Sequence, residues 1–153
     1  MRAAPVDTPP VRVDGCAFCS VVAGATPAHL VYRDERVMAF LDRAPLLRGH
    51  TLLVPLDHYE TLEDLPDDLV APFFILARRL SIAFGTAFAA DGSFVGVNTR
   101  ISQSVPHLHA HVVPRRKGDG LFSRRMSWQR LRYEEGEAER VAADIRGALG
   151  LAG

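Results

Sequence analysis

Cysteine is scarce in this sequence, and charge of neither sign dominates it. The only two cysteines, Cys16 and Cys19, form a Cys-x-x-Cys pair. In a reducing compartment such a pair indicates metal binding or redox chemistry rather than a structural disulfide, although two thiolates are only half of a zinc site. Basic and acidic residues number 18 each, so no global field marks a binder of nucleic acid. We therefore expect no nucleic-acid partner.

Long uninterrupted hydrophobic runs are also missing. The longest apolar region, residues 69–90, is interrupted by Pro72 and by the adjacent Arg78 and Arg79, which argues against a membrane span. The first residues, MRAAPVDTPPVRVDG, carry prolines where a secretory signal needs a continuous apolar stretch. We therefore expect a cytoplasmic protein with no membrane partner.

Enough apolar residues are present for one buried core, since they make up 48% of the chain. We expect residues 1–14 to form a flexible tail and residues 15–116 to form the main domain. Residues 117–153 are expected to add a C-terminal loop and helix to the same domain.

The hydrophobic pattern predicts an α+β fold with five short strands and one long helix. Residues 61–92 have apolar side chains at helical spacing, and Pro72 falls in the first turn of this helix or at a kink. Shorter helices are predicted near residues 16–24 and in the last segment, where Val141, Ile145 and Leu149 share one side. The predicted strands are the two halves of 29–42, which turn at Asp34 and Glu35, then 51–58, 93–98 and 105–114.

The last predicted strand places three histidines at alternate positions, His107, His109 and His111. Alternation puts all three on one face of a strand. A solvated polar face is the simplest explanation, but other polar residues are commoner there. Two of the histidines could instead chelate a catalytic metal. Alternatively, a neutral imidazole could attack phosphorus and form a covalent phosphoramidate.

The residues before the histidines favour phosphate chemistry. Asn98, Gln103 and Ser104 offer side-chain donors in the turn that enters the histidine strand. Such donors, together with loop amides, can surround phosphate oxygens.

With these residues in place, the sequence resembles the histidine triad family. The signature is His-x-His-x-His followed by two apolar residues, and residues 107–113 read HLHAHVV. Further matching segments occur in the family's order over residues 15–120: CAFC, VMAFLD, APLLRGHTLLVP with His58 shortly after, and QSVPHLHAHVVPR. The chain differs from many relatives in having Ser102 where they carry glycine.

The resemblance implies an α+β fold in which two five-stranded antiparallel sheets pair in a two-fold homodimer. It also implies cleavage or transfer at the α-phosphate of a nucleotide. The middle histidine, His109, would be the nucleophile that forms a nucleotidyl-histidine. His111 would contact the phosphate oxygens, and His50 would support the imidazoles.

The resemblance further implies a purine nucleoside pocket, with adenine expected. Phe18, Phe40 and Leu41 would surround the base, and Asp42 would bind the ribose hydroxyls. The alternative for Asp42 is a turn residue that ends a strand.

Bacterial relatives with the Cys-x-x-Cys pair often hold zinc, and the resemblance implies the same here. Two thiolates and two imidazoles suit a closed structural site that does not touch substrate. The implied ligands are Cys16, Cys19, His58 and His107.

Three functions remain open at this point. The protein is a zinc-stabilised nucleotide hydrolase or transferase, a nucleotide-binding regulatory module with little catalysis, or a hydrolase whose triad holds a catalytic metal. Residues 115–117 and Arg124 and Arg125 could meet a long polyphosphate, but clustered arginines are more often a solvated surface.

Overall fold

The computed structural model describes residues 10–124 and 129–151. Most of the predicted tail and Arg125 lie outside the described residues. Five strands form one antiparallel sheet in the order β1-β2-β3-β5-β4. The elements in chain order are α1 (Ala17–Val22), β1 (Leu30–Arg33), β2 (Val37–Leu41), β3 (Thr51–Pro55), the 3₁₀ turn Leu62–Asp64, α2 (Asp67–Phe88), β4 (Gly92–Val97), β5 (Ala110–Arg115) and α3 (Glu137–Ala148). The predicted five-stranded α+β fold is confirmed.

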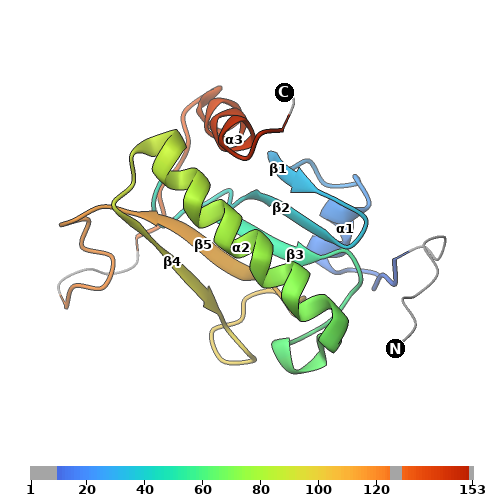
Figure 1. Cartoon of the computed structure of the whole chain (residues 1–153). Coiled ribbons are helices and arrows are strands. Elements are labelled where there is room, and N and C mark those ends of the chain that lie inside the picture. Colours follow the sequence, from blue (N-terminus) through green and yellow to red (C-terminus); the bar gives the residue numbers. More distant parts are fainter. Residues whose placement is uncertain (1–9, 125–128, 152–153) are drawn as a thin grey trace.

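Both faces of the central strands are covered. Figure 1 shows α2 crossing one face of the sheet, with α1 on the other side and α3 beside the β1 end. Val37, Ala39 and Leu41 of β2 pack in the core under α2, whereas Met38 and Phe40 pack with α1. Every residue of β2 and β3 is therefore buried, and the strands read as continuous apolar runs.

The long helix tolerates its internal proline because another side chain replaces the missing bond. Pro72 lies in the second turn of α2 and has no N–H to donate to the carbonyl of Asp68. Arg36 Nη1 donates to that carbonyl at 3.2 Å, and Arg36 Nη2 pairs with the Asp68 carboxylate at 2.8 Å. By length and composition α2 could cross a membrane, but a core helix meets the same test, and its inner side is buried against the sheet.

The histidine strand begins later than predicted, at Ala110 instead of residue 105. Leu108 N donates to the carbonyl of Tyr59 at 2.7 Å, so this backbone is bonded to a loop instead of a strand. Side-chain alternation nevertheless continues through the irregular part. Leu108, Ala110 and Val112 enter the core under α2, and His109 contacts Phe18 of α1 on the opposite side.

The C-terminal segment braces the loop between β2 and β3. Leu131 N donates to the carbonyl of Pro45 at 2.8 Å, and the hydroxyl of Tyr133 accepts from Gly49 N at 3.0 Å. Arg48 forms an ion pair with Glu137. This loop leads directly into His50, so the brace acts on the surroundings of the histidines.

Candidate active site

A cavity of about 510 Å³ opens between α1, the end of β2 and the histidine strand. This volume falls in the range of pockets that hold small-molecule ligands. Asn98, Gln103 and His50 are not among its lining residues. The predicted site residues that do line it are Phe18, Phe40, Leu41, Asp42, Ser104, His109 and His111.

Hydrogen bonding fixes which nitrogen of His109 carries a proton. His109 Nδ1 lies 2.8 Å from the carbonyl oxygen of His107, which can only accept, so Nδ1 donates. Nε2 therefore keeps its lone pair. Burial lowers the pKa of His109, and the ring of Phe18 packs edge-on against it at 5.0 Å. A neutral imidazole with a free Nε2 lone pair is a nucleophile at neutral pH.

His50 and His111 form a second ordered pair. The N–H of Leu46 donates to His50 Nδ1 at 3.1 Å, so the proton of the neutral ring lies on Nε2. His50 Nε2 then donates to His111 Nδ1 at 2.9 Å. His111, also neutral, keeps its own proton on Nε2. His111 thus lines the cavity with one imidazole N–H available to an anion.

Burial keeps this pair uncharged. It lowers the pKa of His50 to about 3 and that of His111 to about 4. Asp42 lies 3.8 Å from His50 Nδ1, but that nitrogen already accepts from Leu46. The contact between Asp42 and the neutral imidazole is therefore not an ion pair.

Both oxygens of Asp42 have protein partners. Oδ1 accepts from Ala44 N at 2.9 Å, as expected for a residue that turns the chain after a strand. Oδ2 accepts from Arg130 Nη1 at 2.9 Å, and the same nitrogen donates to the carbonyl of Ala44 at 2.9 Å. Asp42 therefore both stabilises the turn after β2 and lines the cavity.

The side chain of Gln103 fixes the backbone of the loop before the histidines. Its Nε2 donates to the carbonyls of Glu60 at 2.7 Å and Val105 at 3.1 Å, and its Oε1 accepts from Arg100 N at 2.8 Å. Ser102 has a φ of 60°, the left-handed conformation that favours glycine. The amide of Gln103 is used in shaping the loop, and of Asn98, Gln103 and Ser104 it is Ser104 that lines the cavity, next to Val105.

Asn98 follows the last residue of β4. Val97 pairs with Ala110 and Gly96 pairs with His111. Continuing this antiparallel register places Asn98 opposite His109, on the same face of the sheet. Its position is beside the histidines even though it does not line the cavity.

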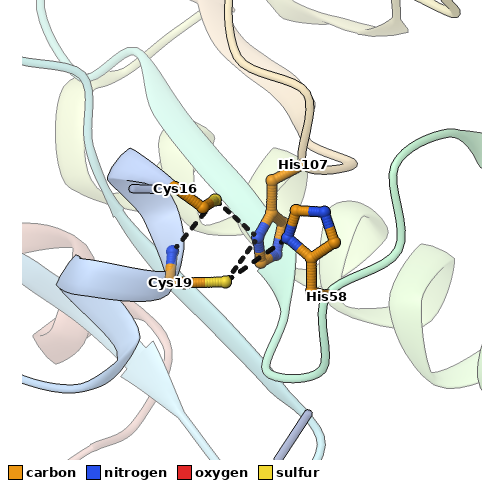
Figure 2. A group of neighbouring side chains, drawn as sticks. All are labelled: Cys16, Cys19, His58 and His107. Atoms are coloured by element: carbon orange, nitrogen blue, oxygen red, sulfur yellow. Dashed lines mark hydrogen bonds between the residues drawn. The ribbon is translucent and has the colours of Figure 1, made fainter. Parts of the chain in front are cut away.

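A second cluster joins Cys16, Cys19, His58 and His107 (Figure 2). Cys16 is the N-cap of α1, and its sulfur accepts from Cys19 N at 3.4 Å, which places both sulfurs at one end of the helix. His107 Nδ1 lies 3.5 Å from each sulfur, and His58 Nδ1 lies 3.3 Å from Cys19 Sγ. Two thiols and two imidazoles from three separate segments therefore converge.

The donor set fits a tetrahedral zinc ion. His107 Nε2 lies 3.0 Å from the carbonyl oxygen of Pro55, so Nε2 donates and Nδ1 directs a lone pair at the sulfurs. With zinc bonds of about 2.3 Å to sulfur and 2.0–2.1 Å to nitrogen, adjacent ligand atoms of a tetrahedron lie roughly 3.5 Å apart. The observed nitrogen–sulfur distances of 3.3 to 3.5 Å match this spacing.

The triad itself does not form a metal cluster. His107 belongs with the cysteines, and His109 uses Nδ1 to donate to the His107 carbonyl. Asp42, His50 and His111 also lie close together. In that group, however, both nitrogens of His50 and Nδ1 of His111 are already hydrogen-bonded. The geometry disfavours a catalytic ion held by the triad.

Comparison with known proteins identifies the family of the chain. The HIT domain family matches residues 23–118, which is more than half of the chain. The chain belongs to the histidine triad family. Its sequence is 42% identical over 107 residues to an uncharacterized HIT-like protein of Methanocaldococcus jannaschii, covering 69% of this chain and 82% of that protein.

Other histidine triad proteins are similar in sequence or structure. A Zn-bound histidine triad family protein from Mycobacterium smegmatis superposes with a TM-score of 0.77 at 35% identity, covering 89% of this chain and 94% of that one. An adenylylsulfatase of Arabidopsis thaliana is 34% identical, over 71% of this chain and 56% of its own length. A bis(5'-nucleosyl)-tetraphosphatase of Schizosaccharomyces pombe is 31% identical, over 60% of this chain and 52% of its own length.

Sequence reasoning about the triad missed two residues of the C-terminal segment. Arg130 lines the cavity and pairs with Asp42, and Tyr133 bonds to the backbone beside His50. Both lie beyond the HIT-matching residues 23–118. The sequence signal that could have found Arg130 is weak, because one arginine in an arginine-rich segment does not reveal its distant partner.

Proposed function

We propose that this histidine triad protein is a nucleotide hydrolase or nucleotidyl transferase that cleaves at the α-phosphate, with His109 as the nucleophile. The observation that carries the proposal is the 2.8 Å hydrogen bond from His109 Nδ1 to the His107 carbonyl, which leaves the Nε2 lone pair free. The names of two relatives, adenylylsulfatase and bis(5'-nucleosyl)-tetraphosphatase, support a hydrolase of this kind. Adenosine phosphoramidates and dinucleoside polyphosphates are the expected substrate types.

The proposed reaction has two displacements at phosphorus. His109 Nε2 forms a bond to the α-phosphorus while the bond to the leaving group breaks, and the leaving group departs with the electron pair and is protonated. Water or another acceptor then attacks the same phosphorus, and its proton is released as the phosphorus–nitrogen bond breaks. The N–H of His111 and the hydroxyl of Ser104 stabilise charge on the phosphate oxygens.

The cavity supports a nucleoside beside this phosphate site. Phe18, Phe40 and Leu41 offer an apolar wall to a purine base, with adenine the expected one. Asp42 is the proposed partner of the ribose hydroxyls. Gln103 supports the phosphate loop through its hydrogen bonds to backbone groups. Asn98, opposite His109, is a proposed side-chain donor to the phosphate.

A structural zinc ion is the proposed cofactor. Cys16, Cys19, His58 and His107 would hold it, and it would supply a fixed link between α1, the turn after β3 and the histidine segment. Because burial raises the pKa of the Cys19 thiol, a cation at this position is what would keep it a thiolate. His109 and His111 perform the chemistry without it.

We further propose a two-fold homodimer that works in the cytoplasm. An apolar strip is exposed on α2, formed by Phe74, Ile75 and Ile82. A second copy of the chain would cover this strip in the proposed homodimer. Light scattering should give about twice the chain mass of 16.8 kDa. Two free cysteines as metal ligands fit a reducing compartment.

Intact mass spectrometry tests the catalytic proposal. The protein is mixed with adenosine phosphoramidate, and separately with diadenosine polyphosphates, and both the adenylate adduct and AMP release are measured. The adduct should be absent in His109→Ala and present in His29→Ala, which removes a histidine outside the site. Nucleotide binding with neither adduct nor AMP would instead support the regulatory binding module.

A further inference from the structure

The C-terminal segment supplies a charged side chain to the cavity from outside the HIT-matching residues. Arg130 donates through Nη1 to Asp42 Oδ2 and to the carbonyl of Ala44, both at 2.9 Å. The neighbouring Leu131 N is bonded to the Pro45 carbonyl at 2.8 Å, so the backbone next to the arginine is also fixed. Arg130 is thus held at the Asp42 end of the cavity.

Arg130 uses only one of its three nitrogens in these bonds. Within residues 10–124 and 129–151, Nε and Nη2 have no hydrogen-bond partner, and the side chain is 46% exposed. Arg43 lines the same cavity, is exposed, and forms no hydrogen bond or ion pair with the described residues. Two guanidinium groups with unused donors therefore stand beside one carboxylate.

The charge at this end of the cavity is positive. Among the lining residues Arg43 and Arg130 carry positive charge and Asp42 carries negative charge, while burial keeps His111 neutral at pH 7. A guanidinium offers paired N–H groups that match phosphate oxygens. The carboxylate alone would repel a second anionic group, but paired with Arg130 it no longer does so strongly.

We infer that Arg43 and Arg130 form a second phosphate subsite beside Asp42, which binds a phosphate of the nucleotide other than the α-phosphate attacked by His109. This inference rests on the proposed function. The phosphate could be an ester on the ribose or belong to the leaving group. In dinucleotide-binding domains a carboxylate binds a ribose hydroxyl, or a nearby arginine accommodates a ribose phosphate, so arginines at the ribose-binding position beside Asp42 favour a phosphate on the sugar.

Calorimetric binding to the full, zinc-loaded chain tests the subsite. The ligands are AMP, adenosine 2',5'-bisphosphate, adenosine 3',5'-bisphosphate and the methylene analogue of ADP. Either ribose bisphosphate should bind about tenfold tighter than AMP, the gain expected from one charge-assisted contact. A gain only with the ADP analogue would place the second phosphate on the leaving-group side. In both cases Arg130→Gln should abolish the gain.

Matched variants separate a specific contact from general damage. Arg130→Gln is judged by the ratio of bisphosphate affinity to AMP affinity measured in the same variant, because the substitution also frees an oxygen of Asp42. Arg132→Gln, at an exposed position that does not line the cavity, should keep the full gain. Arg43→Gln removes the second guanidinium at an exposed site and should reduce the gain even if Arg130→Gln perturbs the loop.

The inference is overturned if AMP binds but no second phosphate improves its affinity, or if the gain survives in both Arg130→Gln and Arg43→Gln. Absence of AMP binding by the unaltered protein would instead count against the proposed function itself.

Discussion

His50 Nε2 lies 2.9 Å from His111 Nδ1, although 61 residues separate the two in sequence. His50 directly precedes β3 and His111 lies in β5, two strands that pair side by side. Because Leu46 N occupies the other nitrogen of His50, the direction of the hydrogen bond is fixed. The relationship turns the outward nitrogen of His111 into a donor aimed at the cavity.

Replacing His50 tests this orientation. His50→Leu removes the N–H that fixes the His111 tautomer, so we expect turnover to fall about 10- to 100-fold, the usual effect of losing a supporting partner of a functional histidine. Steady-state kinetics and AMP binding are measured together. His50→Gln, which retains an N–H donor, should recover part of the rate, and an equal loss in both variants would contradict an orienting role.

Acid should weaken the fold through the same pair. The folded pKa values of about 3 for His50 and about 4 for His111 lie below the ordinary histidine value of about 6.5, so between these values the unfolded chain binds more protons than the folded chain. The free energy of unfolding should therefore be constant above about pH 6.5 and fall as the pH drops toward 4. Urea unfolding of the zinc-loaded protein at a series of pH values measures the slope. His111→Gln should reduce that slope, and an unchanged slope would exclude His111 as its source.

Turnover should follow the same protonation. The His109 lone pair and the His111 hydrogen bond to His50 both require neutral imidazoles. We expect kcat to stay near its plateau at neutral pH and to decline only below about pH 5, since burial lowers the pKa of His111 to about 4. A rate profile with a midpoint near 6.5, the value of an exposed histidine, would contradict this expectation.

Removing the metal should affect stability and activity together. Cys16→Ser replaces one sulfur ligand of the proposed zinc site, so zinc content should fall below one per chain and the melting temperature should drop by several degrees. Elemental analysis and thermal unfolding of the variant and of chelator-treated protein measure both. Loss of turnover while the melting temperature stays unchanged would indicate a catalytic ion and contradict a structural one.

The C-terminal brace should contribute measurably to stability. Tyr133→Phe deletes the acceptor of the half-buried Gly49 N–H, and we expect a loss of about 1 kcal/mol in the free energy of unfolding. Tyr32→Phe is the control, because the Tyr32 hydroxyl bonds to Asp34 at an exposed site and its removal should cost less than about 0.5 kcal/mol. Denaturant unfolding compares the two variants. Equal losses would mean that the Tyr133 hydrogen bond stabilises the fold no more than an exposed one does.

The sequence determined the elements and the residue types of the site. Short apolar runs bounded by turn residues produced the strands, helical spacing produced α2, and the spacing of His107, His109 and His111 placed them on one side of the chain. These properties depend on neighbours a few residues apart, which a sequence displays directly. The late start of β5 was not visible, because it depends on Leu108 bonding to the distant Tyr59 carbonyl.

Tertiary structure decided what each histidine can do. The Pro55 carbonyl leaves Nδ1 of His107 for a metal, the Leu46 N–H directs His50 toward His111, and Arg130 reaches Asp42 across 88 residues. Each is a hydrogen bond between groups that folding brings together. An imidazole has two nitrogens of opposite hydrogen-bonding character, and only its partners in space determine which one carries the proton.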